Sequence, residues 1–494
     1  VAELARRWKS RENLVVVALV PEKEGVQPPT AEALLGVLDD VSGSLLAAEM
    51  GDTIATGSIE LMAALPTPGA VIEERFIREV GITEWKFANG ARVLLKPTDF
   101  TPDQVLVTGY GWGGTSVLDD ERLRDAVLAR SMPAVSGLGS LRSNDLRKAV
   151  VGKLLSIGVD IGAYTQSVSG RSTVRDLETF LQLLHLHFVA PRIDEDAIQA
   201  WKKRQVAAIE GRAASPEAHF ADTLRAVMSQ NHPRTRPLTA EDIEALNPQR
   251  ALEVYRERFA DPGGFTFVFV GSFEPDSIRP LIERYIGGLP AGQGSRGWRD
   301  NGVRPPSGVI EKVFRFGREP RARIAIVFHG PYAHSDDDQI ALGALARLLS
   351  TRLRDRLREA LGGTYTVDVR SELHSVPERI YAVQITFDAA PDRVEEMQRA
   401  VFEEIERLRN GGPTEEEIAQ LREEVSRELE LALKSNSFWL RLITTHDQME
   451  RPLAELANYR EHTAGRVTAK LVHEMSRRYL DSRRYVRVTQ LPAE

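Results

Sequence analysis

Hydrophobic and polar positions along the chain follow the periods of strands and helices and predict an α/β fold. Apolar residues at 85–87 and 92–95 flank Asn89-Gly90, a dipeptide typical of the turn of a β-hairpin. After this hairpin the pattern predicts a third strand at 104–110 and a closing strand at 265–270. Between these two strands it predicts helices at 119–130, 173–188, 194–213 and 248–259.

The same order of elements recurs from Val309 to the end of the chain. Strands are expected at 309–315, 322–329, 364–370, 379–387 and 485–490, and helices at 336–361, 391–409, 414–435 and 466–479. Thr414, followed by Glu417 at the third helical position, forms a capping box, and Asp194 begins the counterpart helix of the first set. The repetition predicts two homologous α/β domains, each a mostly antiparallel sheet packed against helices.

A short closing unit occurs three times. In each copy an aromatic residue ends a helical pattern, a polar turn follows, and a strand starts six residues after the aromatic. The copies are Trp8 with Leu14–Ala18, Phe259 with Phe265–Phe269, and Tyr479 with Tyr485–Thr489. Because almost nothing precedes the first copy, we expect the chain to begin at the tail of a domain whose body it lacks.

These patterns divide the chain into four parts. Residues 1–21 are expected to hold the tail strand and helix of a preceding domain, and the proline-punctuated residues 22–80 an inter-domain linker. The first complete domain covers 81–290 and the second covers 308–494. A Gly-, Pro- and Arg-rich stretch at 287–307 marks the boundary between them.

Composition narrows the classes of function. A net charge of −7 gives no basic surface of the kind that nucleic-acid binding requires. No apolar run reaches the roughly 20 residues that a membrane-spanning helix needs. The absence of cysteine excludes disulfides, thiolate zinc sites and a cysteine nucleophile. We therefore expect no nucleic acid among the partners and no membrane span.

Three phrases give the chain a family resemblance. They are Trp85–Pro97, the run from Asp176 through Leu184 to Arg192, and Arg358–Tyr365. With the paired α/β domains, they resemble the second half of the pitrilysin/insulinase-type zinc peptidases, and the resemblance covers nearly the whole chain. In that family four such domains form a two-halved clamshell, and the first domain binds zinc on an inverted H-x-x-E-H motif.

The chain contains no H-x-x-E-H sequence, and the segment that would correspond to the catalytic helix, Leu123–Arg130, holds no histidine. Hydrolytic zinc needs about three protein ligands. The resemblance therefore implies an inactive-domain half without metal ligands or catalytic residues, which is expected to be inactive on its own. No cofactor is expected in this chain, and zinc is expected in a missing N-terminal half.

The resemblance also implies partners and a location. The expected partners are the zinc-bearing N-terminal half, in the same polypeptide or as a separate subunit, and peptide or unfolded polypeptide substrates. A homodimer is a further candidate assembly. The family favours the bacterial periplasm or cell envelope over the cytoplasm.

Arg358 and Tyr365 are the candidate substrate-binding residues. Arg358 falls in the last turn of a predicted helix, Gly362-Gly363 ends that helix, and Tyr365 opens the next strand. The pair resembles the substrate-binding Arg and Tyr of the family. A guanidinium and a phenol can donate hydrogen bonds to a peptide carbonyl and to the oxyanion that develops from it.

A structural interpretation of this pair stays open. Arginine interacts favourably with the dipole in any last helical turn, and Tyr365 shares a strand face with Val367 and Val369. Three neighbouring arginines are expected to form solvated helix surface, namely Arg352, Arg354 and Arg356.

Other candidate sites have simpler explanations. His185 and His187 lie two apart in a helical pattern, which turns them to different faces. His329 and His334 precede Asp336–Asp338 at a strand end and a helix start, where aspartates are explained by capping and the dipole. Gly111–Gly114 lacks the spacing of a phosphate-binding loop. A metal enzyme built on residues 329–338 remains a third interpretation, behind a second one in which the chain is a catalytically inactive scaffold or peptide-binding subunit.

Overall fold

The computed structural model describes residues 14–18, 20, 27–43, 59–292, 297–333, 336–360 and 366–493. The chain divides into two compact units, Val1–Ile59 and Glu60–Glu494. In the described part of the first unit, α2 (Ala31–Gly43) is the one helix, and Leu14–Ala18 are not a strand. The strand predicted at 14–18 is therefore wrong here, because a strand needs a neighbour to pair its backbone groups and no described strand provides one. Trp8 lies outside the described residues.

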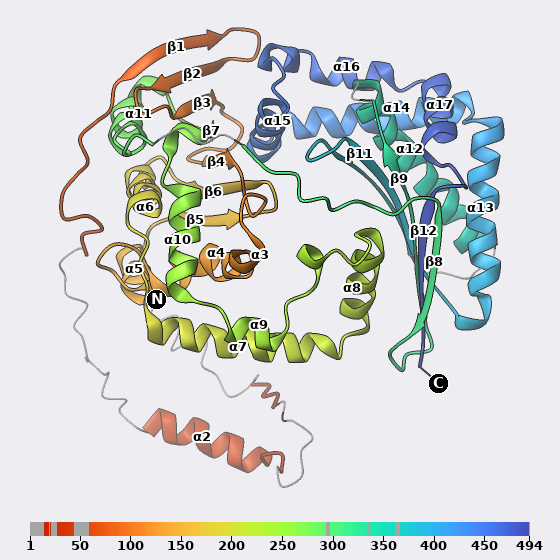
Figure 1. Ribbon diagram of the computed structural model, residues 1–494, viewed down its shortest axis with the longest axis horizontal. Helices are drawn as coiled ribbons and strands as arrows, with labels where there is room; N and C mark the ends of the chain where they lie inside the picture. Colours follow the sequence, from red (N-terminus) through yellow and green to blue (C-terminus); the bar gives the residue numbers. More distant parts are fainter. Residues whose placement is uncertain are drawn as a thin grey trace. The chain divides into compact units, whose positions relative to one another are not determined.

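The second unit begins with a seven-stranded sheet of order β1-β2-β3-β7-β4-β6-β5 (Figure 1). β3 and β7 are parallel, and all other neighbours are antiparallel. The strands are β1 (Val71–Ile77), β2 (Ile82–Phe87), β3 (Arg92–Pro97), β4 (Val105–Trp112), β5 (Leu155–Ile161), β6 (Thr165–Ser172) and β7 (Phe265–Gly271). The predicted hairpin at Asn89-Gly90 joins β2 to β3, and Gly90 takes the positive φ of 86° that suits glycine in such a turn.

β1 corrects part of the linker prediction for residues 22–80. Its residues 71–77 form the edge of the sheet and pair with β2. The middle of the strand, Glu73–Arg75, is charged and exposed. A charged edge strand protects a sheet from unwanted pairing, but it lacks the alternation of apolar residues by which a strand is recognised in a sequence.

The helices of this domain lie on one face of this sheet, except α8, which packs on the sheet of the second domain. They are α3 (Asp120–Leu123), α4 (Asp125–Ser136), α5 (Ser143–Ala149), α6 (Leu177–Val189), α7 (Glu195–Ala213), α8 (Pro216–Met228), α9 (Ala240–Glu244), α10 (Pro248–Phe259) and α11 (Pro275–Ile282). Phe267 and Phe269 of β7 point into a core shared with Leu128 of α4, Phe180 of α6 and Tyr255 of α10. Successive strand residues face opposite sides of a sheet, so Val268 and Val270 point to the other face.

The second sheet has five strands of order β10-β11-β9-β12-β8, with β12 and β8 parallel. The strands are β8 (Val309–Arg315), β9 (Ala322–Pro331), β10 (Val367–His374), β11 (Ile380–Ala389) and β12 (Tyr485–Leu491). β7 and β12 follow Phe259 and Tyr479 as predicted, so two of the three closing units are confirmed.

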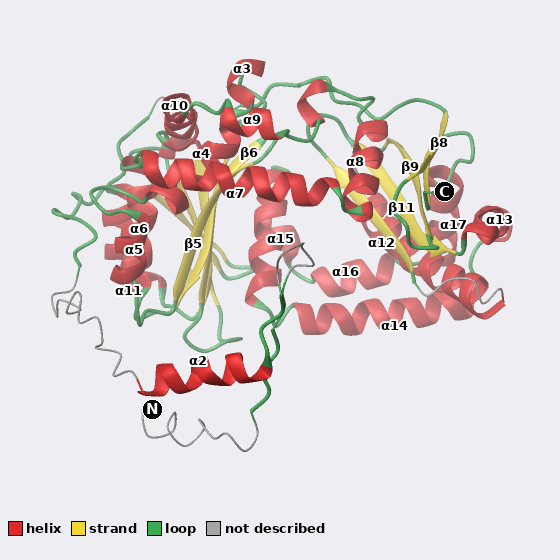
Figure 2. Ribbon diagram, turned by 90° about the horizontal axis from the view of Figure 1, so that it is seen from below, coloured by secondary structure: helices red, strands yellow, loops and turns green. Residues whose placement is uncertain are grey.

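The helices of this second part include a group that extends beyond the sheet. They are α12 (Asp336–Arg354) with its continuation as a π-helical turn, η5 (Asp355–Ala360), and α13 (Val394–Gly411), α14 (Glu415–Ala432), α15 (Asn436–Gln448), α16 (Tyr459–Arg466) and α17 (Ala469–Tyr479). α14 and α16 lie side by side (Figure 2). The capping box of Thr414 and Glu417 is confirmed. Together the two mixed sheets and their helices confirm the predicted α/β class.

The two sheets exchange helices. α15 of the second domain packs on the outer face of the first sheet, where Ile443 joins Leu94, Val268 and Val270 in an apolar cluster. α8 of the first domain packs on the outer face of the second sheet, where Phe220 joins Val327, Val486 and Val488. Each domain therefore buries an apolar sheet face against a helix from the other.

Polar contacts accompany the exchange. Asp447 near the end of α15 accepts hydrogen bonds from the Arg92 guanidinium (2.5 Å) and the Tyr110 hydroxyl (2.5 Å) of the first sheet. Burial lowers the pKa of Arg92, but attraction to Asp447 and the bond to Glu84 outweigh it, so the net shift is upward. The side chain of Asp447 is only 7% exposed, so this cluster lies within the contact between the domains.

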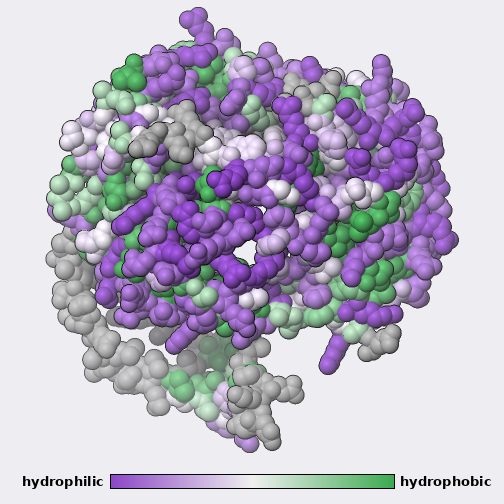
Figure 3. All heavy atoms as spheres, in the orientation of Figure 1, coloured by the Kyte–Doolittle hydropathy of each residue, from purple (hydrophilic) through white to green (hydrophobic). Residues whose placement is uncertain are grey.

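No helix in the described part of the chain is long and apolar enough to span a membrane. Hydrophilic residues cover most of the visible face in Figure 3, and hydrophobic residues form separate patches.

Candidate functional site

The predicted substrate-binding pair lies where α12 passes into β10. Arg358 is in η5, but its side chain is outside the description, and Tyr365 is outside the described residues altogether. β10 begins at Val367, two residues after Tyr365. The helix thus reaches at least Ala360, and the strand starts at Val367 rather than at the predicted residue 364. The contact of the Arg358 and Tyr365 side chains with a substrate stays a prediction.

Arg352, near the end of α12, was expected on the solvated helix surface but forms hydrogen bonds to other parts of the second domain. Its guanidinium bonds both Glu417 carboxylate oxygens (2.7 and 2.8 Å), the Gly412 carbonyl (3.2 Å) and Glu404 (3.4 Å). Arg352 is therefore not solvated surface; the start of α14 packs against it. This hydrogen-bonded guanidinium lowers the pKa of Glu417 to about 2. Arg354 is exposed as expected, and Arg356 bonds Glu403 (3.3 Å).

The group around His329 has a structural role in the described residues. His329 is buried in β9, and burial, with Arg484 nearby, lowers its pKa to about 4, so its imidazole is neutral at pH 7. Asp338 at the start of α12 accepts a hydrogen bond from the Tyr479 hydroxyl and pairs with Arg478 (3.4 Å). His334 and the side chains of Asp336 and Asp337 lie outside the description. Within the described part of the chain, no three His, Asp or Glu residues are grouped to hold a metal.

His185 and His187 belong to the core of the first domain. Their Nδ1 atoms contact different partners, the Tyr285 carbonyl at 2.9 Å and the Tyr255 hydroxyl at 3.2 Å. Burial lowers the pKa of both, that of His187 to about 4. The two rings are on separate faces of α6, as their spacing predicts.

α3 and α4 hold Leu123–Arg130, the segment expected from the resemblance to correspond to the family's catalytic helix. Arg124 pairs there with Asp242 (3.0 Å), and Arg130 lies 3.8 Å from Asp160. Asp125 is fully buried and accepts a hydrogen bond from Arg250 (2.7 Å). Guanidinium groups are permanently charged and do not ligate metals, and both oxygens of Asp125 already accept hydrogen bonds, from Arg250 and from the Asn247 N–H. These side chains do not supply the roughly three ligands that hydrolytic zinc needs.

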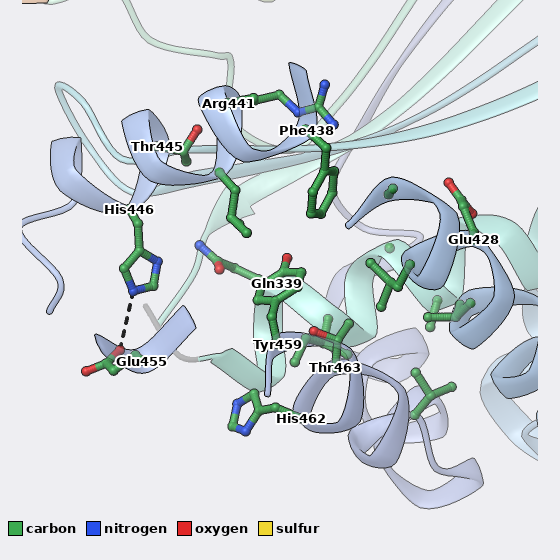
Figure 4. A pocket seen from close by; sticks show the side chains of 18 of the residues that line it. Gln339, Glu428, Phe438, Arg441, Thr445, His446, Glu455, Tyr459, His462 and Thr463 are labelled. Atoms are coloured by element: carbon green, nitrogen blue, oxygen red, sulfur yellow. Dashed lines mark ion pairs between the residues drawn. The ribbon is translucent and has the colours of Figure 1, made fainter. Parts of the chain in front are cut away.

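A large cavity lies in the second domain and was not predicted. It has a volume of about 1000 Å³ and is enclosed by α12, α14, α15 and α16 (Figure 4). Sequence analysis missed it because neither α15 nor α16 was predicted. Trp439 and Ile443, four residues apart and both packed against the first sheet, carry the helical spacing that could have revealed α15.

Ion pairs border this cavity. Arg347 of α12 forms an ion pair with Glu428 of α14. Glu455 forms an ion pair with Arg451 (2.7 Å) and lies 3.6 Å from His446. Arg441 of α15 lies over the Phe438 ring at 5.6 Å (Figure 4). The wall is thus apolar along its helices and charged at its margin, as in pockets that orient a partly apolar ligand.

Sequence comparisons find similarity to proteins that are named zinc proteases. Residues 245–425 match the family model described as the peptidase M16 inactive domain. The chain is 28% identical over 411 residues to an Arabidopsis thaliana protein named zinc protease PQQL-like, with 77% of this chain and 39% of the relative covered. It is 22% identical to the probable zinc protease PqqL of Escherichia coli, with 74% and 39% covered. The chain therefore spans about two fifths of the length of these relatives.

Solved structures agree in fold. The periplasmic protease PqqL from Escherichia coli superposes with a TM-score of 0.78 at 19% identity, covering 94% of this chain and 51% of that one. A peptidase M16 inactive domain from Pseudomonas fluorescens superposes with a TM-score of 0.70 at 18% identity, covering 84% and 98%. The resemblance predicted from the sequence is confirmed. Residues 245–425 match the inactive-domain model, and the similar curated proteins are named zinc proteases.

Proposed function

We propose that this chain is the non-metal half of a zinc metallopeptidase, which closes over peptide substrates and binds them for hydrolysis by a zinc-bearing N-terminal half. The observation that carries the proposal is the match of nearly the whole chain to half of a two-halved protease fold. The inactive-domain match, which extends from α10 to α14, supports the same assignment. So does the absence of H-x-x-E-H from the sequence.

In this proposal Arg358 and Tyr365 contact the substrate. Zinc bound in the partner half would supply the activated water. Arg358 would donate to the peptide carbonyl and stabilise the negative charge that develops on its oxygen, while Tyr365 would donate from the start of the next strand. The bonds of Arg352 to Glu417 and Gly412 fix the preceding helix turn, which restricts the positions that Arg358 can take.

The proposal extends to location and assembly. Escherichia coli PqqL is described as periplasmic, and we propose an envelope compartment for this chain as well. A cysteine-free sequence suits an oxidising compartment. The zinc-bearing half would be joined in the same polypeptide or associate as a subunit, because each half alone lacks part of the chamber.

Replacing Arg358 tests the substrate-binding role. In the assembled enzyme we expect Arg358→Ala to reduce kcat/KM for a quenched fluorescent peptide by about a hundredfold. Arg358→Lys should recover only part of this loss, because an ammonium lacks the planar donor fork. Arg354→Ala, at an exposed position on the same helix, is the control. A fall of several degrees in Tm for Arg358→Ala, with kcat/KM unchanged, would instead assign Arg358 a structural role.

A further inference from the structure

The cavity between α12, α14, α15 and α16 has an apolar interior. Its walls include Ile340 and Ala344 of α12, Val425 and Leu429 of α14, and Phe438 and Leu442 of α15. A volume of about 1000 Å³ is at the upper end of the range, about 300–1,000 Å³, of pockets that enclose small ligands. The space therefore accommodates several side chains of a peptide.

Gly343 opens this space on the α12 side. It lines the cavity on a helix, and a Cβ built on it would meet no heavy atom within 4 Å. Glycine costs helix stability compared with other residues. A larger side chain at this position would extend into the cavity without displacing a neighbour.

Among the described residues at the margin of the cavity, one arginine has no acidic partner. Arg347 is neutralised by Glu428, and Glu455 is engaged by Arg451. Arg441 lines the same cavity, lies over Phe438, and has no carboxylate partner in the described part of the chain. A guanidinium next to an aromatic ring, beside an apolar space, is suited to a carboxylate attached to an apolar group.

The Thr463 hydroxyl supports a polar occupant. Its oxygen is buried at the cavity wall and has no hydrogen-bond partner among the described residues. A buried hydroxyl without a partner is costly, and a peptide amide or carbonyl in the cavity would satisfy it. Thr463 lies on α16, and Arg441 lies on α15, so a peptide bonded to both would run through the cavity (Figure 4).

We propose that this cavity is a binding pocket for a short peptide segment in which a large apolar side chain stands next to a carboxylate. The apolar side chain fills the space between Gly343 and Phe438, and the carboxylate pairs with Arg441. The carboxylate comes from an acidic side chain or from the C-terminus of the peptide. The site goes beyond the proposed function, because this chain would bind the peptide in the absence of a zinc-bearing half.

Fluorescence anisotropy with the full chain and fluorescein-labelled Gly-Ser-Leu-Glu amide tests the apolar part. We expect saturable binding that Gly343→Leu weakens at least about tenfold, because the leucine occupies the space of the ligand. Gly211→Leu is the matched control, since Gly211 is an exposed helical glycine with equally open space outside the cavity. The Tm of Gly343→Leu should be unchanged or raised because leucine favours helix. Absence of binding by the unmodified chain, or equal binding by Gly343→Leu, overturns the proposal.

Arg441→Gln tests the carboxylate part at an exposed residue whose loss leaves the core intact. We expect about tenfold weaker binding of the Leu-Glu peptide and no change for its Leu-Gln analogue, as for loss of a charge-assisted hydrogen bond. A third peptide that ends in leucine with a free carboxylate distinguishes the two carboxylate sources. Equal effects of Arg441→Gln on the Leu-Glu and Leu-Gln peptides overturn the pairing. A failure of the proposed function would show as lost hydrolysis in the assembled enzyme while anisotropy binding persists.

Discussion

The first and second domains follow one plan but differ in what their equivalent helices enclose. α8 follows the long helix α7 in the first domain, and α15 follows the long helix α14 in the second. Both are donated to the other domain, where Phe220 and Ile443 cover equivalent outer sheet faces. The repeated element is thus the one that joins the domains, and neither sheet buries both faces without its neighbour.

The start of the first long helix shows a second shared feature. Asp125 of α4 and Asp338 of α12 are both buried, and each is bonded from the helix that precedes the closing strand, by Arg250 and by Tyr479 respectively. Beyond this shared anchor the domains diverge. The α4 segment carries paired arginines, whereas α12 borders the large cavity and continues toward Arg358. The comparison indicates that the plan is kept for packing, while both proposed binding sites belong to the second domain.

The largest expected effect comes from breaking the helix exchange. Phe220→Ala and Ile443→Ala should each lower the free energy of unfolding by about 3–4 kcal/mol, because each leaves a cavity against the other domain's sheet. Equilibrium urea unfolding of the full chain measures both. The comparison predicts that each variant weakens both domains together. A separate early transition of one domain, with the other unchanged, would contradict the exchange as the joining element.

A smaller effect is expected from the polar part of the same contact. Asp447→Ala leaves Arg92 and Tyr110 without their shared acceptor and should cost about 3 kcal/mol of unfolding free energy. Glu430→Ala is the control, since its pair with Lys434 is exposed on both sides and should contribute less than about 0.5 kcal/mol. Equal effects of the two variants in urea unfolding would show that the buried cluster does not stabilise the contact.

The smallest expected effect is pH-dependent and specific to the second domain. The hydrogen bonds from Arg352 lower the pKa of the Glu417 carboxyl from its ordinary value of 4.5 to about 2 in the folded protein. A lowered pKa stabilises the fold above about pH 4.5, and this contribution is lost as pH falls toward 2. We expect about 1 kcal/mol of unfolding free energy, after screening by solvent, to separate the unmodified chain from Glu417→Gln at pH 7. Urea unfolding at pH 7, 4.5 and 3 should show the difference shrinking. Glu415→Gln, on the same helical turn, leaves the bonds between Arg352 and Glu417 intact and is the control.

The elements predicted correctly are those whose own residues show a helical or strand period or a capping or turn signal. The hairpin at Asn89-Gly90, the capped helices at Asp194 and Thr414, and the closing strands β7 and β12 all appear where expected. The strand β1 was not predicted because its exposed charged residues lack the alternation of a strand. The helices α8 and α15 were not predicted because their apolar faces are buried against the sheet of the other domain. The local pattern of apolar and polar residues does not show which distant segment a helix packs against.

The residues of the candidate sites also differ in whether local sequence could reveal them. Arg358 and Tyr365 were found through a family resemblance at a helix–strand junction, and they remain predictions. Arg352 was predicted as surface but is bonded to Glu417, which lies 65 residues later in the chain. The cavity depends on four helices, two of which were not predicted, so no single segment of the sequence could indicate it.

The most direct test of the account is hydrolysis of a quenched fluorescent peptide in the presence of zinc, by this chain alone and with a zinc-bearing N-terminal half added. We expect cleavage only in the mixture, at a rate that rises with the amount of this chain until the two halves are equimolar. A mixture that binds the peptide without cleaving it would favour the scaffold or peptide-binding alternative. Cleavage by this chain alone would contradict the account, because it would require a catalytic centre within these 494 residues.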